Sequence, residues 1–145
     1  MHGAEAVWVG TRFVAAKEAG APPRHQKSVV EAGYSDTIRT VIFTGRPMRI
    51  RKTNYSADWE NNKQDQIKKL TSEGVIPVEW DMARRLEKGD EISLKERMEI
   101  MPLLMGQTAG AIDKVESAED IINNMVNDCV QSLRGNAGRI VASRL

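Results

Sequence analysis

The chain has 145 residues, 41% of them hydrophobic, and its 21 Lys and Arg residues nearly balance 20 Asp and Glu residues, leaving a net charge of +1. This balance excludes a global electrostatic attraction to nucleic acid or anionic lipid, and the length suits one domain. The single cysteine excludes an internal disulfide, and no apolar run reaches the roughly 20 residues of a membrane span. We therefore expect a cytoplasmic protein with no nucleic-acid partner and no membrane partner.

The first predicted element is a short strand over Ala6 to Val9, because these residues are apolar and uncharged, as in strands buried on both faces of parallel sheets. It ends at Gly10, where we expect a close backbone approach or an unusual φ. A helix over Arg12 to Ala19 follows, with Thr11 as its cap. Free N–H groups at this helix start would suit a phosphate, although the bare pattern also fits a simple strand-to-helix turn.

A second helix is predicted over Pro23 to Ala32, with Gly33 as its stop. The β-branched alternation from Ile38 to Thr44 predicts a second strand, which the turn at Gly45 to Pro47 closes. The basic residues that follow are interpreted as solvated surface rather than a nucleic-acid patch, since no aromatic platform lies among them. They are Arg46, Arg49, Arg51 and Lys52.

Four further helices are expected toward the C-terminus. They run from Ser56 to Gly74, from Asp81 to Lys88, from Ser93 to Met101, and from Ser117 to Gly135. The last one has an N-terminal capping signal in Ser117 and Asp120 and a continuous apolar stripe, so it must bury against something. A frayed tail over 136–145 completes the chain.

The search for reactive groups identifies no catalytic residue and no metal ligand set. Cys129 lies on the apolar stripe of the last helix without a nearby histidine, so it is interpreted as a core thiol. His25 lies in a polar helix start and is interpreted as a surface imidazole. No cluster of His, Cys and carboxylates has metal-ligand spacing.

Two apolar strands far apart in the sequence cannot form a stable sheet by themselves. A strand buried on both faces implies partners outside this chain. The simplest interpretation is that the chain is the C-terminal part of a larger α/β protein and begins just before the last strand of a barrel.

Four segments in order carry a resemblance to a known family. They read GAEAVWVGTRFVAAKEAGA, DTIRTVIFTGRPMRIRK, DWENN and LLMGQTAGAI, the last followed by the helix from Ser117. Together they resemble the C-terminal half of the nitronate monooxygenases, formerly called 2-nitropropane dioxygenases, and are closest to the fungal-type members. The resemblance covers the chain from Gly3 to about Leu133.

The resemblance implies an α/β fold, with the C-terminal portion of an FMN-binding TIM barrel, here its last strand, and a mostly helical second-domain region. As an isolated chain it should be dominated by helices. Residues 1–34 would hold the last barrel strand and the helices after it, and residues 35–116 the helical second-domain region with one strand and the GQTAG loop. Residues 117–135 would form the C-terminal amphipathic helix.

The family reaction implied for the whole protein is the oxidation of an alkyl nitronate, or of a nitroalkane, by molecular oxygen through FMN. By resemblance, Gly10 and Thr11 would bind the FMN phosphate, where such barrels place phosphates. Gly106 and Gln107 would lie near the flavin or substrate, although their loop could also be only a flexible or tightly packed connection. The histidine base belongs upstream of Gly3, so an inactive fragment and a helical interaction module remain as alternatives.

Overall fold

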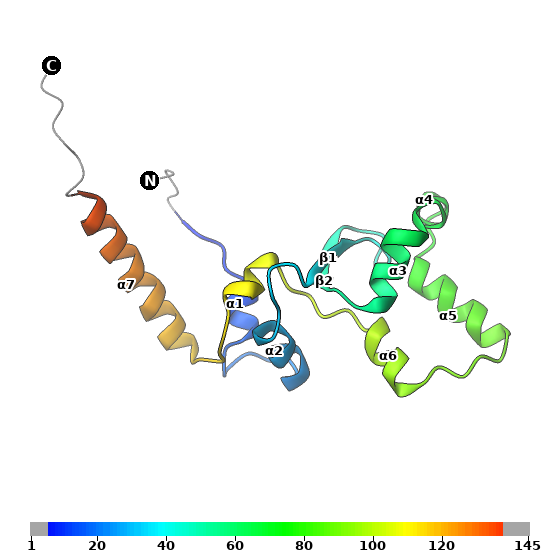
Figure 1. Cartoon of the computed structure of the whole chain (residues 1–145), viewed down its shortest axis with the longest axis horizontal. Helices are drawn as coiled ribbons and strands as arrows, with labels where there is room; N and C mark the ends of the chain where they lie inside the picture. Colours follow the sequence, from blue (N-terminus) through cyan, green and yellow to red (C-terminus); the bar gives the residue numbers. More distant parts are fainter. Residues whose placement is uncertain (1–5, 138–145) are drawn as a thin grey trace, which may run out of the picture.

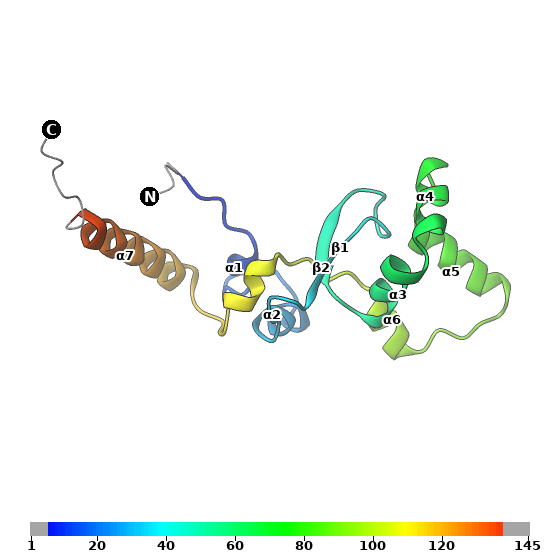
Figure 2. The same ribbon diagram turned by 45° about the horizontal axis from the view of Figure 1, so that its top comes forward.

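The computed structural model describes residues 6–137, and helices dominate them, as predicted (Figure 1). The elements are α1 (Thr11–Val14), α2 (Pro23–Val30), β1 (Thr37–Thr40), β2 (Met48–Arg51), α3 (Asn54–Asn62), α4 (Gln64–Ser72), α5 (Pro77–Glu87), α6 (Leu94–Ile100), the 3₁₀ helix η1 (Gln107–Ala111) and α7 (Ala118–Ala137). They form an elongated body with α3 to α6 at one end, α1, α2 and η1 in the middle, and α7 at the other end (Figures 1 and 2).

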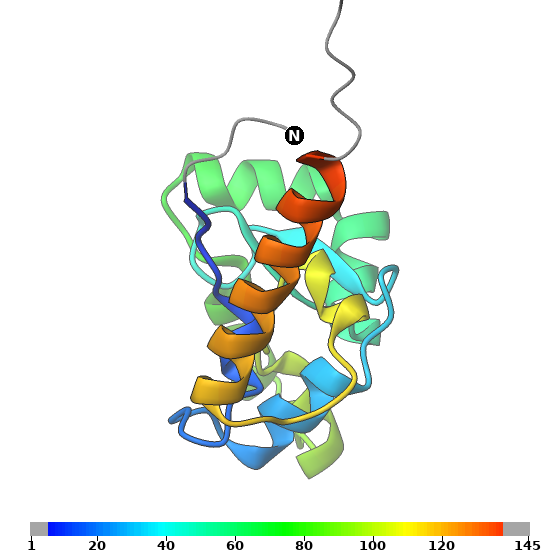
Figure 3. The same ribbon diagram turned by 90° about the vertical axis from the view of Figure 1, so that its left-hand side faces the viewer.

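The N-terminal segment does not form the strand expected over Ala6 to Val9. Residues 6–10 have no regular secondary structure, and Trp8 is fully exposed. The physical reason is that an apolar strand needs neighbours to satisfy its backbone, and residues 6–137 offer it none. The segment runs beside α7, and Val7 and Val9 line an apolar groove together with residues of that helix (Figure 3).

Helix α1 is shorter than the sequence predicts, because a tertiary contact ends it. The expected helix to Ala19 stops at Val14, and Ala16 forms a parallel β-bridge with Glu116. The Lys17 N–H donates to the Glu116 carbonyl at 2.8 Å, a bond that a continuing helix would have used internally. This bridge ties the start of the chain to the segment before α7.

Helix α2 starts at Pro23 as predicted and ends at Val30, two residues early. It packs with α1 and η1 around the first of two small cores. This cluster contains Ala15, Val29, Ala32, Met105, Ala109 and Ile112. Residues 15–32 and 105–112 therefore share one core although some seventy positions separate them.

The two strands form an antiparallel hairpin, of which the sequence analysis found only the first half. The predicted strand over Ile38 to Thr44 stops at Thr40, because the chain turns through Gly45, whose φ is +71°, and returns as β2. Ile38 pairs with Ile50, and Arg39 pairs with Arg49. Ile50 is 1% exposed, so β2 alternates between a buried face and a face that carries arginines.

The second core lies beyond the hairpin and is centred on Trp59. Ile42, Trp59, Ile67 and Leu70 form it. The single helix expected over Ser56 to Gly74 is two helices, α3 and α4, which are broken at Lys63 and set at an angle to each other (Figure 2). The Lys63 ammonium lies 4.9 Å from the centre of the Trp59 ring and pairs with Asp58 at 2.6 Å, which stabilises the break.

The remaining helices follow the predicted order with shifted starts. Helix α5 begins at Pro77, four residues earlier than expected, and α6 is opened by a capping box between Ser93 and Glu96.

Helix α7 is capped as predicted, since the Ser117 hydroxyl accepts a bond from the Asp120 N–H at 3.1 Å. Its stripe, however, is largely uncovered within residues 6–137, with Ile121 buried and Cys129 exposed. The interpretation of Cys129 as a core thiol is therefore wrong. The tail expected to fray is described only up to residue 137, and its remainder lies outside the described residues.

Candidate functional site

Three segments far apart in the sequence meet at the start of α1. The Gly106 N–H donates to the Thr11 Oγ1 at 2.9 Å. Its neighbour Met105 donates its N–H to the Arg49 carbonyl at 3.1 Å. Two consecutive residues thus connect α1 to β2, and the structure brings together Thr11 and Gly106, which the sequence analysis assigned to the same site.

A pocket of about 290 Å³ lies at this junction. Its lining residues are Thr11, Val14, Arg49, Leu104, Met105 and Gly106. Gly10 and Gln107 do not line it, although each adjoins a residue that does. The Gln107 side chain is exposed at the start of η1. Two of the four expected site residues therefore share one pocket, and the other two flank it.

The hydroxyl of Thr11 is oriented by its bond to Gly106. Because the oxygen accepts from the Gly106 N–H, the hydroxyl hydrogen is left to donate elsewhere. The backbone N–H groups of residues 10–12 also have no acceptor within residues 6–137. Thr11 is not the helix cap that was predicted, since Gly10 occupies that position and Thr11 is the first helical residue. This junction therefore presents several hydrogen-bond donors and few acceptors.

Gly10 does not need to be glycine for the fold. Its φ is −105°, and an added Cβ would meet no atom within 4 Å. The expectation of an unusual φ at this position is wrong, and within residues 6–137 no protein atom closely approaches the backbone here. The absence of a side chain leaves the space in front of the α1 N–H groups open.

Close packing constrains the two glycines of the GQTAG segment, Gly110 more tightly than Gly106. A Cβ on Gly106 would lie 3.3 Å from the Thr11 Oγ1, and a Cβ on Gly110 would lie 2.6 Å from the Tyr34 backbone nitrogen. The segment is the 3₁₀ helix η1, and Ala109 within it is fully buried. It is tightly packed rather than flexible, which fixes the position of Gly106 against Thr11.

Arg49 is the pocket residue that the sequence analysis missed. Its side chain is half-buried rather than solvated, and its Nη1 donates to the Thr37 Oγ1 at 3.1 Å. Arg39 lies directly across the hairpin, so two like charges face each other, an arrangement that costs stability. Within residues 6–137, neither guanidinium forms an ion pair with a carboxylate. The alternation of Met48 and Ile50 with two arginines could have indicated a strand with a basic face.

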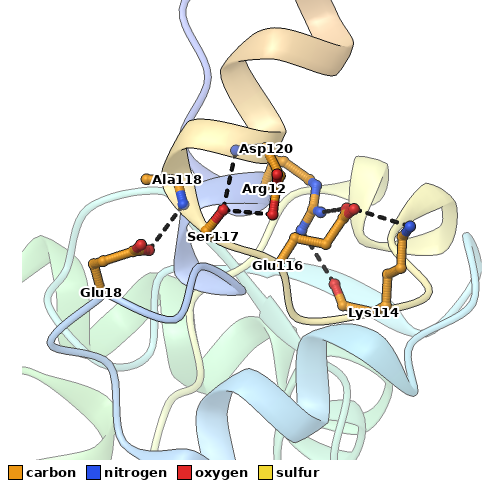
Figure 4. A network of polar contacts seen from close by, with 7 residues as sticks. All are labelled: Arg12, Glu18, Lys114, Glu116, Ser117, Ala118 and Asp120. Atoms are coloured by element: carbon orange, nitrogen blue, oxygen red, sulfur yellow. Dashed lines mark hydrogen bonds and ion pairs between the residues drawn. The ribbon is translucent and has the colours of Figure 1, made fainter.

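The other arginine near this pocket is neutralised. Arg12 pairs with Glu116 and donates to the Lys114 carbonyl at 3.2 Å, while Lys114 pairs with Glu116 at 2.9 Å (Figure 4). Lys114 and then Arg12 hold the pKa of the Glu116 carboxyl below its ordinary value. Glu18 accepts from the Ala118 N–H at 2.8 Å in the same network. These contacts anchor the first turn of α7 to the body and leave Arg49 as the unneutralised cation of the pocket.

His25 has a structural role beside the pocket. The ring lies half-buried at the surface, and its Nε2–H donates to the Leu104 carbonyl at 2.7 Å, a contact that the sequence did not predict. This bond fixes the pocket wall at Leu104 and engages one ring nitrogen.

Over residues 6–137, no group of three or more His, Cys, Asp or Glu residues could hold a metal ion. Helices long and apolar enough to cross a membrane are likewise not found in that range.

Comparison with solved structures places this fold in a known class. The backbone is similar to FabK from Thermotoga maritima, with a TM-score of 0.66 and 27% identity over 95% of this chain and 41% of FabK. A substituted form of the same FabK matches with a TM-score of 0.61. The fold of this chain is thus one that FabK contains as part of a longer protein.

Sequence comparison identifies the family. The family model for nitronate monooxygenase matches residues 1–128, so the chain belongs to the nitronate monooxygenase family. "Putative monooxygenase Rv1533" of Mycobacterium tuberculosis is 27% identical over 131 residues, and "Probable nitronate monooxygenase" of Bacillus subtilis is 23% identical over 129 residues. These matches cover 90% and 89% of this chain but 34% and 35% of the relatives. The chain therefore spans about a third of the curated relatives it matches.

Proposed function

We propose that this chain forms the C-terminal part of an FMN-dependent nitronate monooxygenase, which oxidises alkyl nitronates with molecular oxygen to a carbonyl compound and nitrite. Membership of the family and the similarity to FabK and to the two monooxygenase relatives support this proposal. In the whole protein, this chain supplies cofactor contacts and no catalytic acid or base. The fungal-type assignment stays a prediction.

The single observation that carries the proposal is the pocket at the start of α1. Its donors suit a phosphate: the Thr11 N–H and hydroxyl and the guanidinium of Arg49, with the Gly10 N–H directly beside the pocket. Gly106 lies against Thr11 without a side chain, and its N–H orients the Thr11 hydroxyl. Bound FMN would supply the redox chemistry. The residues of this chain would hold its phosphate and, through Gly106 and Gln107, border the flavin or substrate.

The N-terminal segment supports the barrel part of the proposal. Val7, Val9 and Phe13 line an apolar groove of about 490 Å³ with residues of α7. Trp8 is fully exposed beside it. Exposed apolar surface of this kind marks a site of association, and in the whole protein the segment over Ala6 to Val9 would be the last barrel strand.

The same groove favours the second candidate, a helical interaction module without catalysis. In that case the apolar faces of Phe13 and α7 would bind another protein instead of completing a barrel. The two candidates differ in whether restoring a barrel creates a flavin site. A flavin site would support the first, and stable association without flavin would support the second.

The test is a chimera in which this chain replaces the 129 matched residues of the Bacillus subtilis relative. The purified chimera is expected to carry flavin, visible in its absorption spectrum, and to release nitrite when a propyl nitronate and oxygen are supplied. A matched chimera with Arg49→Gln should carry less flavin. The matched control is Arg46→Gln, which makes the same charge change at an exposed residue outside the pocket. A folded chimera without flavin would contradict the proposal.

A further inference from the structure

A second pocket, independent of the site above, lies between α2, the end of β2 and the end of α6. It has a volume of about 320 Å³ and shares no residue with the candidate flavin pocket. Its basic lining residues are Arg24, Lys27, Arg51 and Lys52, and its apolar lining residues are Met98, Met101 and Leu103. Helix α2 provides two of the cations and the end of the hairpin provides the other two, so the fold assembles the charge from segments some 25 positions apart.

The pocket carries more positive charge than its neighbouring carboxylates offset. Glu31 lines it and lies 3.7 Å from Lys27, but both side chains are largely exposed, so this pair is weak. Asp36 lies 3.3 Å from Arg51. The pKa of the Asp36 carboxyl is lowered mainly by the Gly33 N–H and next by Arg51. The four cations therefore exceed these two carboxylates, and the Lys52 ammonium pairs with no carboxylate in the part of the chain that the structure describes.

Two guanidiniums of the pocket are positioned to donate. Arg24 is held by its bond from Nη2 to the Met98 carbonyl at 2.8 Å, which leaves its other N–H groups available. The Nη1 of Arg51 is buried and lies 3.3 Å from the Asp36 Oδ2, with which it forms an ion pair but no hydrogen bond of good geometry. The other N–H groups of Arg51 form no hydrogen bond within residues 6–137 and can donate to an anion in the pocket. The hydroxyl of Ser28 also lines the pocket.

The opposite wall is apolar and open. Met98 is 42% exposed and Met101 is 59% exposed, so neither side chain is used by a protein core. Flexible thioether side chains adapt to varied apolar ligands. The pocket thus combines forked cationic donors with an adaptable apolar wall, and its volume is that of a small-molecule site.

We propose that this pocket binds a phosphate monoester that carries an apolar group. Two guanidiniums and two ammoniums suit a phosphate dianion better than a single carboxylate, because phosphate offers more acceptor oxygens to forked donors. The methionines take the apolar substituent. The near-zero net charge of the chain and the small volume of the charged site favour a small molecule over a nucleic acid.

Phenyl phosphate is the probe for the whole chain, followed by ¹H–¹⁵N NMR at low ionic strength. We expect saturable shifts at Lys27, Lys52 and Met101, with an affinity about tenfold above that of inorganic phosphate because the ring is buried. Arg24→Gln should weaken phenyl phosphate binding about tenfold, and Lys52→Gln about threefold. Met101→Ser should remove the preference for phenyl phosphate and leave inorganic phosphate binding unchanged.

Arg46→Gln is the matched control, since it removes one exposed charge from the same hairpin outside the pocket. Equal weakening by Arg46→Gln and Lys52→Gln would indicate only general attraction and overturn the proposal. No saturable binding would overturn it, as would shifts confined to Thr11 and Gly106. Tighter binding of a short single-stranded oligonucleotide, with shifts spreading over Arg39 and Arg46, would also overturn it. Lys52 makes no side-chain bond in residues 6–137, so its variant tests the proposal even if Arg24→Gln alters the fold.

Discussion

Replacing Gly110 with alanine tests the packing that positions η1 against Tyr34, in the turn between α2 and β1. An added Cβ would lie 2.6 Å from the Tyr34 backbone nitrogen and 2.7 Å from its Cγ. A backbone atom cannot move aside as the tip of a flexible side chain can. The substitution must therefore displace η1, the segment at Tyr34, or both, and it must disturb the buried Ala109 next to it.

The expected cost follows from the geometry. Overpacking of this kind costs about 1–3 kcal/mol, while Gly→Ala gains about 0.4–1 kcal/mol by restricting the unfolded chain, so we expect a net loss of about 1–2 kcal/mol. Gly106→Ala should cost less, about 1 kcal/mol or below, because its Cβ would meet only the Thr11 Oγ1 at 3.3 Å. Gly20→Ala should be neutral or slightly stabilising, since its Cβ would meet nothing within 4 Å.

The assay is native-state amide hydrogen exchange of Val29, which lies in the same core as Ala109. The free energy of opening at Val29 should be highest in Gly20→Ala, lower in Gly106→Ala and lowest in Gly110→Ala. Chemical shifts of the Trp59 core report whether the remainder of the protein is intact. If Gly110→Ala protects Val29 as well as Gly20→Ala does, the close approach to Tyr34 is not a constraint and the reasoning is wrong.

Three further predictions concern charge and cofactor. The pKa of Glu116 is lowered from its ordinary 4.5, so its stabilisation is complete above that pH and is lost as the pH falls through the folded pKa. Exchange protection of the Lys17 N–H should therefore drop on acidification below 4.5, and Glu116→Gln should flatten this dependence. The purified chain alone should be colourless and should not consume oxygen on adding a nitronate, because one strand end cannot complete a barrel site; a flavin spectrum would disprove this. In the chimera, Gly10→Leu should weaken FMN binding by roughly a hundredfold or more in fluorescence titration, and Thr11→Ala by roughly tenfold. Gly10 has open space around it and an ordinary φ, so Gly10→Leu should still fold. If the folded Gly10→Leu chimera binds FMN with unchanged affinity, the turn at Gly10 has only a structural role.

Features encoded by a few neighbouring residues were predictable. The cap between Ser117 and Asp120, the stop at Gly74 and the turn at Gly45 each depend on local backbone chemistry, and the structure has all three. The start of α2 at Pro23 is of the same kind. Such signals act within one turn, so the sequence order alone reveals them.

Features that depend on distant partners could not be predicted in this way. The end of α1 is set by Glu116, a hundred residues away, and β2 exists only because it pairs with β1. Arg49 lines the pocket only because β2 pairs with β1. Without knowledge of that pairing, the sequence analysis interpreted Arg49 as part of a solvated run. Thr11 and Gly106 were assigned to one site through the family resemblance; the structure brings the two residues into contact, and their role in binding a cofactor stays a prediction.

Helix α7 depends on its surroundings for its own order. After Ile121, its apolar side chains are half-buried or exposed, and its firm attachments lie in its first turn. A 20-residue helix held at one end gains little from intrinsic propensity, since most helical stability in proteins comes from the packing of an apolar face. Its helix content should therefore rise when something covers the stripe through Val126 and Val130. The far-ultraviolet circular dichroism of the chain should therefore show more helix when a partner surface covers α7.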